Sequence, residues 1–193
     1  MNSEVGIVLA WQRTPFRRFQ DVTERELVVG GRRPTSENVI FPLGLNSVVA
    51  AKHKIISGYR STGEIALVIE RGEVKGTSSY HYSSMITTKP HWIRDKLAYP
   101  LAKLSLIKNP LFLTVPHIAE SVRNEEELQI LNIVFARPSV GSPFLLPSKT
   151  PENLVKLVPA AVNAAMKDPE LIAEATKRML THIYPRSALR LVR

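Results

Sequence analysis

A repeated order of apolar strand, hydroxyl-rich loop and helix most constrains what this chain can fold into. In the first repeat, the apolar run at residues 27–29 ends in two glycines, and a helix is expected to follow the segment 35–38. In the second repeat, a strand over residues 53–57 precedes a Ser-Thr-Gly-Glu segment at 61–64 and a short helix, which is expected to end at Gly72. Strands that alternate with helices predict an α/β fold with a mixed, mostly parallel sheet.

The rest of the chain continues this pattern. Further strands are expected at residues 5–11, 74–79, 101–107 and 143–146. Further helices are expected at residues 83–88 and 90–95, and as longer helices that begin near residues 124, 151 and 168.

The composition excludes several classes of protein. The longest nearly uncharged apolar stretches, residues 5–11 and 157–166, are shorter than the roughly 18 to 20 residues of a membrane span. The absence of cysteine excludes disulfide scaffolds, thiolate zinc sites and cysteine nucleophiles. No phosphate-loop or zinc-protease spacing occurs, and the five histidines are scattered singly. We therefore expect a soluble protein with no catalytic activity, no cofactor and no bound metal.

The charge favours an acidic partner. The formal net charge is +9, and a positive field concentrates anions of any kind, whether nucleic acid, small carboxylates or a membrane surface. The basic residues cluster in segments 13–33 and 177–193, with few aromatic residues between them for base stacking. For this reason we do not expect a nucleic-acid site.

Two loops are candidates for an anion site. The segments 32–38 and 59–64 are expected at the carboxyl ends of parallel strands, where ligands of α/β proteins bind. Backbone N–H groups at a helix start can hold a carboxylate or a phosphate, and Ser or Thr adds a further donor. The alternative is that Ser36, Ser61 and Thr62 only cap their helices.

Several segments resemble one family. They are GYRSTGEIAL at 58–67, ERGEV at 70–74, TKPHWIRDK at 88–96, FARP at 135–138, PFLLP at 143–147 and AAMKDPEL at 164–171. In order and spacing these segments, together with NSEVGIVLAW at 2–11, resemble a tripartite tricarboxylate transporter receptor, a Bug-type extracytoplasmic solute-binding protein.

The resemblance implies a periplasmic-binding-protein-like (type II) fold, in which two α/β lobes enclose a cleft. It also implies binding of small organic anions such as carboxylates, their delivery to a membrane permease, and a periplasmic location. The cleft wall implied by the resemblance, together with the loops chosen above, consists of Thr35, Ser36, Tyr59, Ser61, Thr62, Gly63, Ser78, Ser79 and Tyr80.

The same resemblance sets the expected domains. Residues 1–14 correspond to a crossover strand, residues 15–103 to a complete lobe, and residues 104–193 to a hinge strand and a partial first lobe. The export signal and the first part of lobe one have no counterpart, so we interpret the chain as a truncated receptor that is cytoplasmic if it is leaderless. A homodimer is a further expectation, because an incomplete lobe exposes apolar surface. The competing interpretation is a basic interaction protein that reuses the lobe without transport.

Overall fold

A five-stranded mixed sheet lies at the centre of the larger part of the chain. The computed structural model describes residues 5–105, 114–136 and 145–177. The strand order is β3, β2, β4, β1, β5, and β2 runs parallel to β3 and β4 while β1 runs antiparallel to β4 and β5. The strands are β1 (Gly6–Trp11), β2 (Leu27–Gly30), β3 (His53–Ile56), β4 (Gly76–His81) and β5 (Ala98–Leu104).

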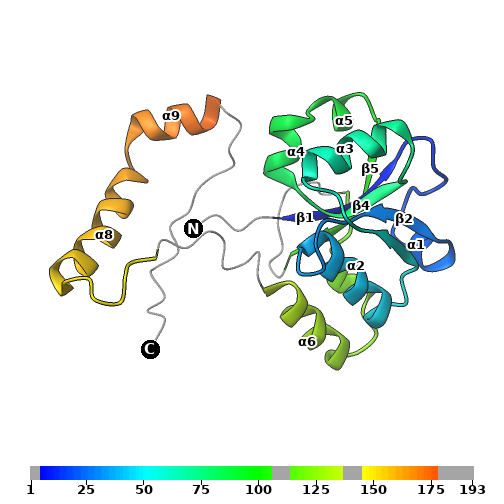
Figure 1. The fold of residues 1–193 in the computed structure, drawn as a ribbon, viewed down its shortest axis with the longest axis horizontal. Coiled ribbons are helices and arrows are strands. Elements are labelled where there is room, and N and C mark those ends of the chain that lie inside the picture. The colour runs from blue at the N-terminus through cyan, green and yellow to red at the C-terminus, as the bar shows by residue number, and fades with distance from the viewer. Residues whose placement is uncertain (1–4, 106–113, 137–144, 178–193) are drawn as a thin grey trace. The chain divides into compact units, whose positions relative to one another are not determined.

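Helices cover both faces of this sheet (Figure 1). Helices α3, α4 and α5 lie over one face, and α1, α2 and α6 lie over the other. The helices are α1 (Gln20–Glu24), α2 (Glu37–Val48), α3 (Thr62–Arg71), α4 (Tyr82–Thr88), α5 (His91–Arg94), the 3-10 helix η1 (Ile118–Ser121) and α6 (Glu125–Val134). This three-layer arrangement confirms the predicted α/β class.

Strand β1 supplies side chains to both layers of the core. Ile7 and Leu9 pack with the residues of α3, α4 and α5, whereas Val8 and Ala10 pack with those of α1, α2 and α6. Successive side chains of a strand point to opposite faces of the sheet. All six residues of β1 are buried, which explains why this segment is a continuous apolar run.

Local sequence signals fix the ends of the helices. The Ser61 hydroxyl accepts a hydrogen bond from the Glu64 N–H and caps α3, which ends at Gly72 with a φ of 82°. The Asn124 side chain caps α6 in the same way by accepting from the Glu127 N–H. These ends lie where the sequence predicts them.

Two expectations about strands need correction. Among the described residues, two strand pairings are parallel and two are antiparallel, so the sheet is less parallel than expected. The cause is β1, whose direction no sequence signal specifies. The expected strand at 143–146 is not found at Leu145 and Leu146, and residues 143–144 lie outside the described part.

The chain divides into two compact units, one formed by residues 4–139 and one by residues 1–3 and 140–193. The expected domain boundaries at residues 14 and 103 stay a prediction. Strand β1 belongs to the same sheet as β2 to β5, and Phe135 packs on Phe41 with ring centroids 4.8 Å apart. Helix α6 therefore covers apolar surface of α2, a tertiary contact that the sequence pattern does not reveal.

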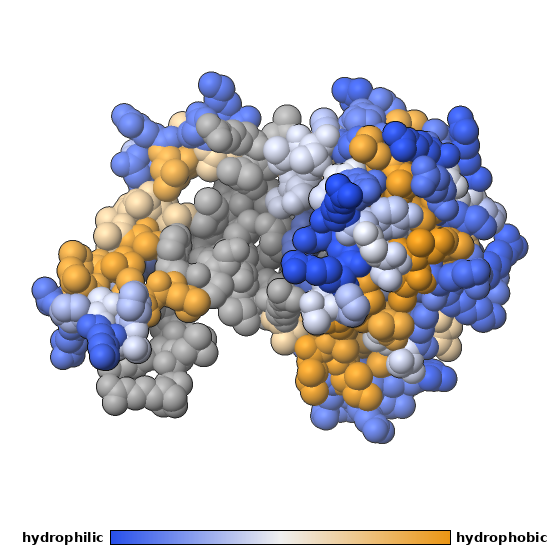
Figure 2. All heavy atoms as spheres, viewed as in Figure 1, coloured by the Kyte–Doolittle hydropathy of each residue, from blue (hydrophilic) through white to orange (hydrophobic). Residues whose placement is uncertain are grey.

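The second unit contains α8 (Glu152–Ala165) and α9 (Pro169–Lys177), and neither helix has a buried residue. Asp168 caps α9, since its Oδ1 accepts from the Glu170 N–H at 2.8 Å. Leu154, Val155 and Leu157 are exposed, and Figure 2 shows apolar residues gathered along α8. Nowhere in the described ranges is a helix long and apolar enough to span a membrane.

Candidate functional site

The candidate site lies where β2, β3 and β4 end. These strands are parallel, so the loops that follow them emerge at the same edge of the sheet. A cavity of about 630 Å³, called here the loop cavity, opens at this edge. Its lining residues are Arg32, Arg33, Thr35, Ser36, Glu37, Asn38, Thr62, Gly63, Ser79, Tyr80, His81, Ser84, Thr88 and Lys89.

Most of the residues expected to form the binding wall line this cavity. The residues that do so are Thr35, Ser36, Thr62, Gly63, Ser79 and Tyr80. Tyr59, Ser61 and Ser78 are not among the lining residues. Ser61 is occupied as the cap of α3, Ser78 is fully buried within β4, and Tyr59 packs against the apolar cluster under α3.

The start of α2 is built differently from the start of α3. Ser36 occupies the cap position of α2, but its hydroxyl makes no capping hydrogen bond. It lies instead 2.5 Å from the Arg33 carbonyl oxygen and 2.7 Å from Asn38 Oδ1. Helix capping therefore does not explain the position of the Ser36 hydroxyl. The N–H groups in the first turn of a helix lack intrahelical acceptors and carry the positive end of its dipole, which suits an anion.

At the start of α3, Ser61 satisfies the N–H of Glu64 and the Ser61 carbonyl accepts from Ile65 at 3.2 Å. Thr62 and Gly63 are the first two residues of the helix and both line the cavity. Their N–H groups have no intrahelical acceptor at these positions. Two helix N-termini, those of α2 and α3, thus meet at one cavity.

The charged side chains around the cavity are mostly positive. Arg32, Arg33 and Lys89 line it, and Glu37 is the one carboxylate among the described lining residues. Glu37 Oε2 lies 2.7 Å from His81 Nε2, so the carboxylate has a partner on β4. A small anion would meet an excess of positive charge here.

Lys89 is held from outside the cavity by Glu70. The Lys89 Nζ donates to Glu70 Oε1 at 2.7 Å, and the Trp92 Nε1 donates to the same oxygen at 2.9 Å. Burial raises the pKa of the Glu70 carboxyl, but these hydrogen bonds outweigh burial and hold the pKa below its usual range. Glu70 therefore stays ionised and fixes Lys89 at the cavity wall.

The individual residues predicted from the sequence did not include six that line the cavity, namely Arg32, Arg33, His81, Ser84, Thr88 and Lys89. The loop 32–38 was expected to carry the site, but its arginines have no periodic or motif signal that distinguishes them from solvated surface charges. His81, Ser84, Thr88 and Lys89 enter the cavity through the tertiary packing of α4 beside β4. A sequence pattern cannot show that packing.

The arrangement supports binding of an anion. Within the described residues, no group of three or more His, Asp or Glu side chains could hold a metal ion. The hydroxyls, helix N-termini and arginines of the cavity are hydrogen-bond donors for anionic oxygens.

No protein-family model and no curated protein matches this sequence. A TctC solute-binding protein from Polaromonas, solved with no ligand, matches with a TM-score of 0.50 and 12% identity, over 72% of this chain and 55% of its own. A protein of R. palustris, solved with adipate, matches with a TM-score of 0.61 and 16% identity, over 91% of this chain and 56% of its own. This chain thus spans a little over half the length of these two structures. The expected resemblance to a Bug-type receptor is confirmed at the level of the fold.

Proposed function

We propose that this chain is a solute-binding protein that holds a small organic carboxylate in the loop cavity and leaves it chemically unchanged. The observation that supports this proposal is the meeting of two helix N-termini and three cationic side chains at one cavity. The fold shared with solute-binding proteins, one of them solved with adipate, supports the same conclusion.

The energetics favour an anion with strong hydrogen-bond acceptors. Hydrogen bonds to a charged group contribute roughly 1.5 to 3 kcal/mol each, so two of them strengthen binding by about two to four orders of magnitude. The N–H groups of Thr62 and Gly63 are candidate donors, because both residues line the cavity at the start of α3.

The test uses titration calorimetry with adipate on the pure chain and on two variants of one residue. Thr62→Pro removes the backbone N–H at the first position of α3, where proline is compatible with the helix and with the extended backbone of Ser61. Thr62→Ala removes only the hydroxyl and is the matched control. We expect Thr62→Pro to weaken adipate binding by about tenfold and Thr62→Ala to weaken it less.

A short DNA duplex titrated at two salt concentrations tests the competing interpretation. A basic interaction protein would bind the duplex with an affinity that falls steeply with salt, and would give no signal with adipate. That combination would overturn the proposal. Equal affinities of the two Thr62 variants would argue against binding at the start of α3.

The cellular context is also a proposal. By the resemblance to Bug-type receptors, we propose a periplasmic location and a membrane permease as the partner that receives the ligand. A homodimer stays a prediction, and light scattering of the pure chain would measure the oligomeric state.

A further inference from the structure

Arg32 differs from the other cations of the loop cavity. Lys89 is paired with Glu70, and Arg33 is exposed to solvent. Arg32 is partly buried, and its Nε is buried without a hydrogen-bond partner among the described residues. A buried N–H donor of a charged group that lacks an acceptor is destabilising, so the protein leaves this guanidinium with an unsatisfied donor.

The backbone holds Arg32 in a fixed place. Its N–H donates to Asn38 Oδ1 at 3.0 Å, and its carbonyl accepts from the Gly58 N–H at 3.0 Å. A Cβ at the preceding Gly31 would lie 2.6 Å from Val39 Cγ2, so the loop packs too closely on α2 for a larger residue. The backbone of Arg32 therefore belongs to a closely packed turn between β2 and α2. Because this backbone is already fixed, less conformational entropy is lost when the arginine binds an anion.

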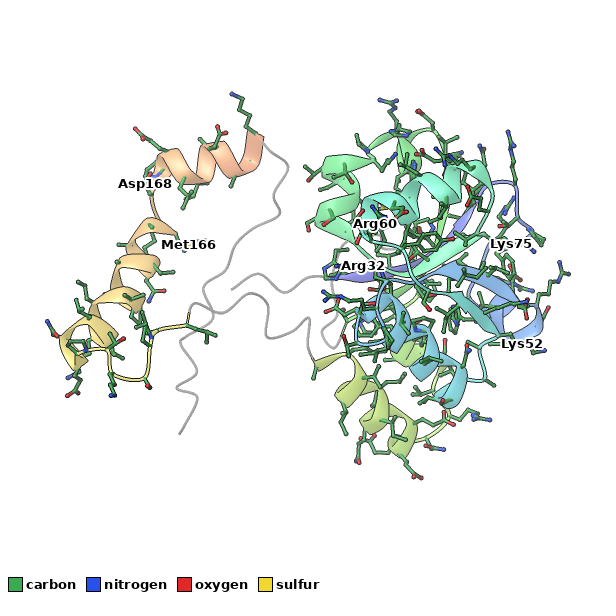
Figure 3. All side chains as sticks on the ribbon, viewed as in Figure 1. Arg32, Lys52, Arg60, Lys75, Met166 and Asp168 are labelled. Carbon is green, nitrogen blue, oxygen red and sulfur yellow. The ribbon has the colours of Figure 1, made fainter. Side chains whose placement is uncertain are left out.

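The start of α3 and Arg32 offer two different kinds of anion contact. The helix start supplies neutral N–H donors from Thr62 and Gly63, whereas Arg32 supplies a planar, permanently charged fork. The loops that carry them are hydrogen-bonded to each other through Gly58 and Arg32, and Figure 3 shows Arg32 and Arg60 on these two loops. A cavity of about 630 Å³ has room for more than one carboxylate.

We propose that Arg32 is the residue that selects ligands with a second carboxylate. One carboxylate of the ligand binds at the helix start and the second binds the Arg32 guanidinium. This inference rests on the proposed function and assigns a specificity role within the same cavity.

The experiment compares adipate with its monomethyl ester, which has the same chain length and one carboxylate fewer. Calorimetry of the full chain gives the ratio of the two affinities, and the same ratio is measured for Arg32→Gln and Arg32→Lys. We expect Arg32→Gln to weaken adipate binding by about 10- to 100-fold and to change the binding of the ester by less than about threefold. Arg32→Lys keeps the charge but loses the fork, so it should restore adipate binding only in part.

Arg60→Gln is the matched control. Arg60 lies on the neighbouring loop, is exposed and does not line the cavity, and its recorded contact with Glu64 is made by its backbone N–H. We expect this variant to alter the adipate affinity by less than about threefold, since exposed charges are screened by salt. Circular dichroism confirms that each variant is folded.

The outcomes separate the two proposals. If the unaltered chain binds neither acid, the proposed function is wrong and the role of Arg32 is wrong with it. If the chain binds both acids and Arg32→Gln weakens both equally, or Arg60→Gln lowers adipate affinity as strongly, the proposed function stands and the selective role of Arg32 is refuted.

Discussion

His53 makes the stability of the larger unit depend on pH. The residue is 6% exposed at the start of β3, and its Nδ1 lies 3.0 Å from Asn46 Oδ1. The Asn46 amide is oriented by two further hydrogen bonds, because it donates to the His53 carbonyl and accepts from the His53 N–H, both at 2.8 Å. An amide oxygen only accepts, so Nδ1 carries the proton and Nε2 is a buried atom without a partner.

Protonating His53 would place a charge at this buried nitrogen. Burial lowers the pKa of His53 from 6.5 to about 4. The unfolded chain therefore takes up the proton at higher pH than the folded chain does. The resulting stabilisation is complete above pH 6.5 and is lost as the pH falls from 6.5 to 4.

The size of the effect follows from these two pKa values. Between pH 7 and pH 5, His53 alone lowers the free energy of unfolding by about 2 kcal/mol. The variant His53→Asn keeps an N–H donor near Asn46 and cannot titrate in this range. We expect the difference in unfolding free energy between the natural chain and the variant to shrink by about 2 kcal/mol from pH 7 to pH 5.

Urea unfolding followed by tryptophan fluorescence measures this difference, because Trp11 and Trp92 are both buried in the unit that contains His53. Subtracting the variant from the natural chain at each pH cancels every titration that the two share. His91→Asn controls for the loss of a histidine at a more exposed position, where 39% of the side chain is accessible. If the difference in unfolding free energy between the natural chain and His53→Asn is the same at pH 7 and at pH 5, the reasoning is refuted.

Two further predictions concern the sheet and the cavity. A Cβ at Gly76 would overlap the Leu9 carbonyl oxygen of the neighbouring strand, so Gly76→Ala should lower the unfolding free energy by roughly 2 to 3 kcal/mol in urea titrations. Gly63→Ala, whose Cβ would meet only the Ser61 hydroxyl at 3.6 Å, should leave stability nearly unchanged. Glu37→Gln removes the carboxylate that lines the loop cavity, so calorimetry should show adipate binding about 3- to 10-fold tighter. An unchanged or weaker affinity would contradict this, and Glu26→Gln, an exposed change just before β2 begins, is its control.

The parts of the fold that the sequence predicted are those with local causes. The cap at Ser61, the left-handed Gly72 and the cap at Asn124 each act within a few residues of the chain. The alternation of strands and helices also has local causes, and for this reason the sequence predicted the α/β class.

The parts that could not be predicted depend on contacts between distant segments. The antiparallel direction of β1 is decided by its partners β4 and β5, and the packing of Phe135 on Phe41 moves α6 into the larger unit. The hydroxyl-rich loops 32–38 and 59–64 were predicted as a binding site because the carboxyl ends of parallel strands meet at one edge of the sheet. Arg32 was not singled out, because the difference between a solvated arginine and one with a buried Nε lies in the tertiary structure.

The position of β1 also bears on how the chain folds. It is the first of the strands in the described part of the chain, yet its two neighbours in the sheet are the fourth and fifth of them, β4 and β5. During synthesis β2, α2 and β3 can pack as a local parallel unit, whereas β1 must wait for residues 76–81 and 98–104. Pairings between segments this far apart close large loops and slow folding relative to helical proteins of similar size. We infer that insertion of β1 between its two late partners is the step that completes the sheet, and that until then the apolar segment 6–11 needs protection from aggregation.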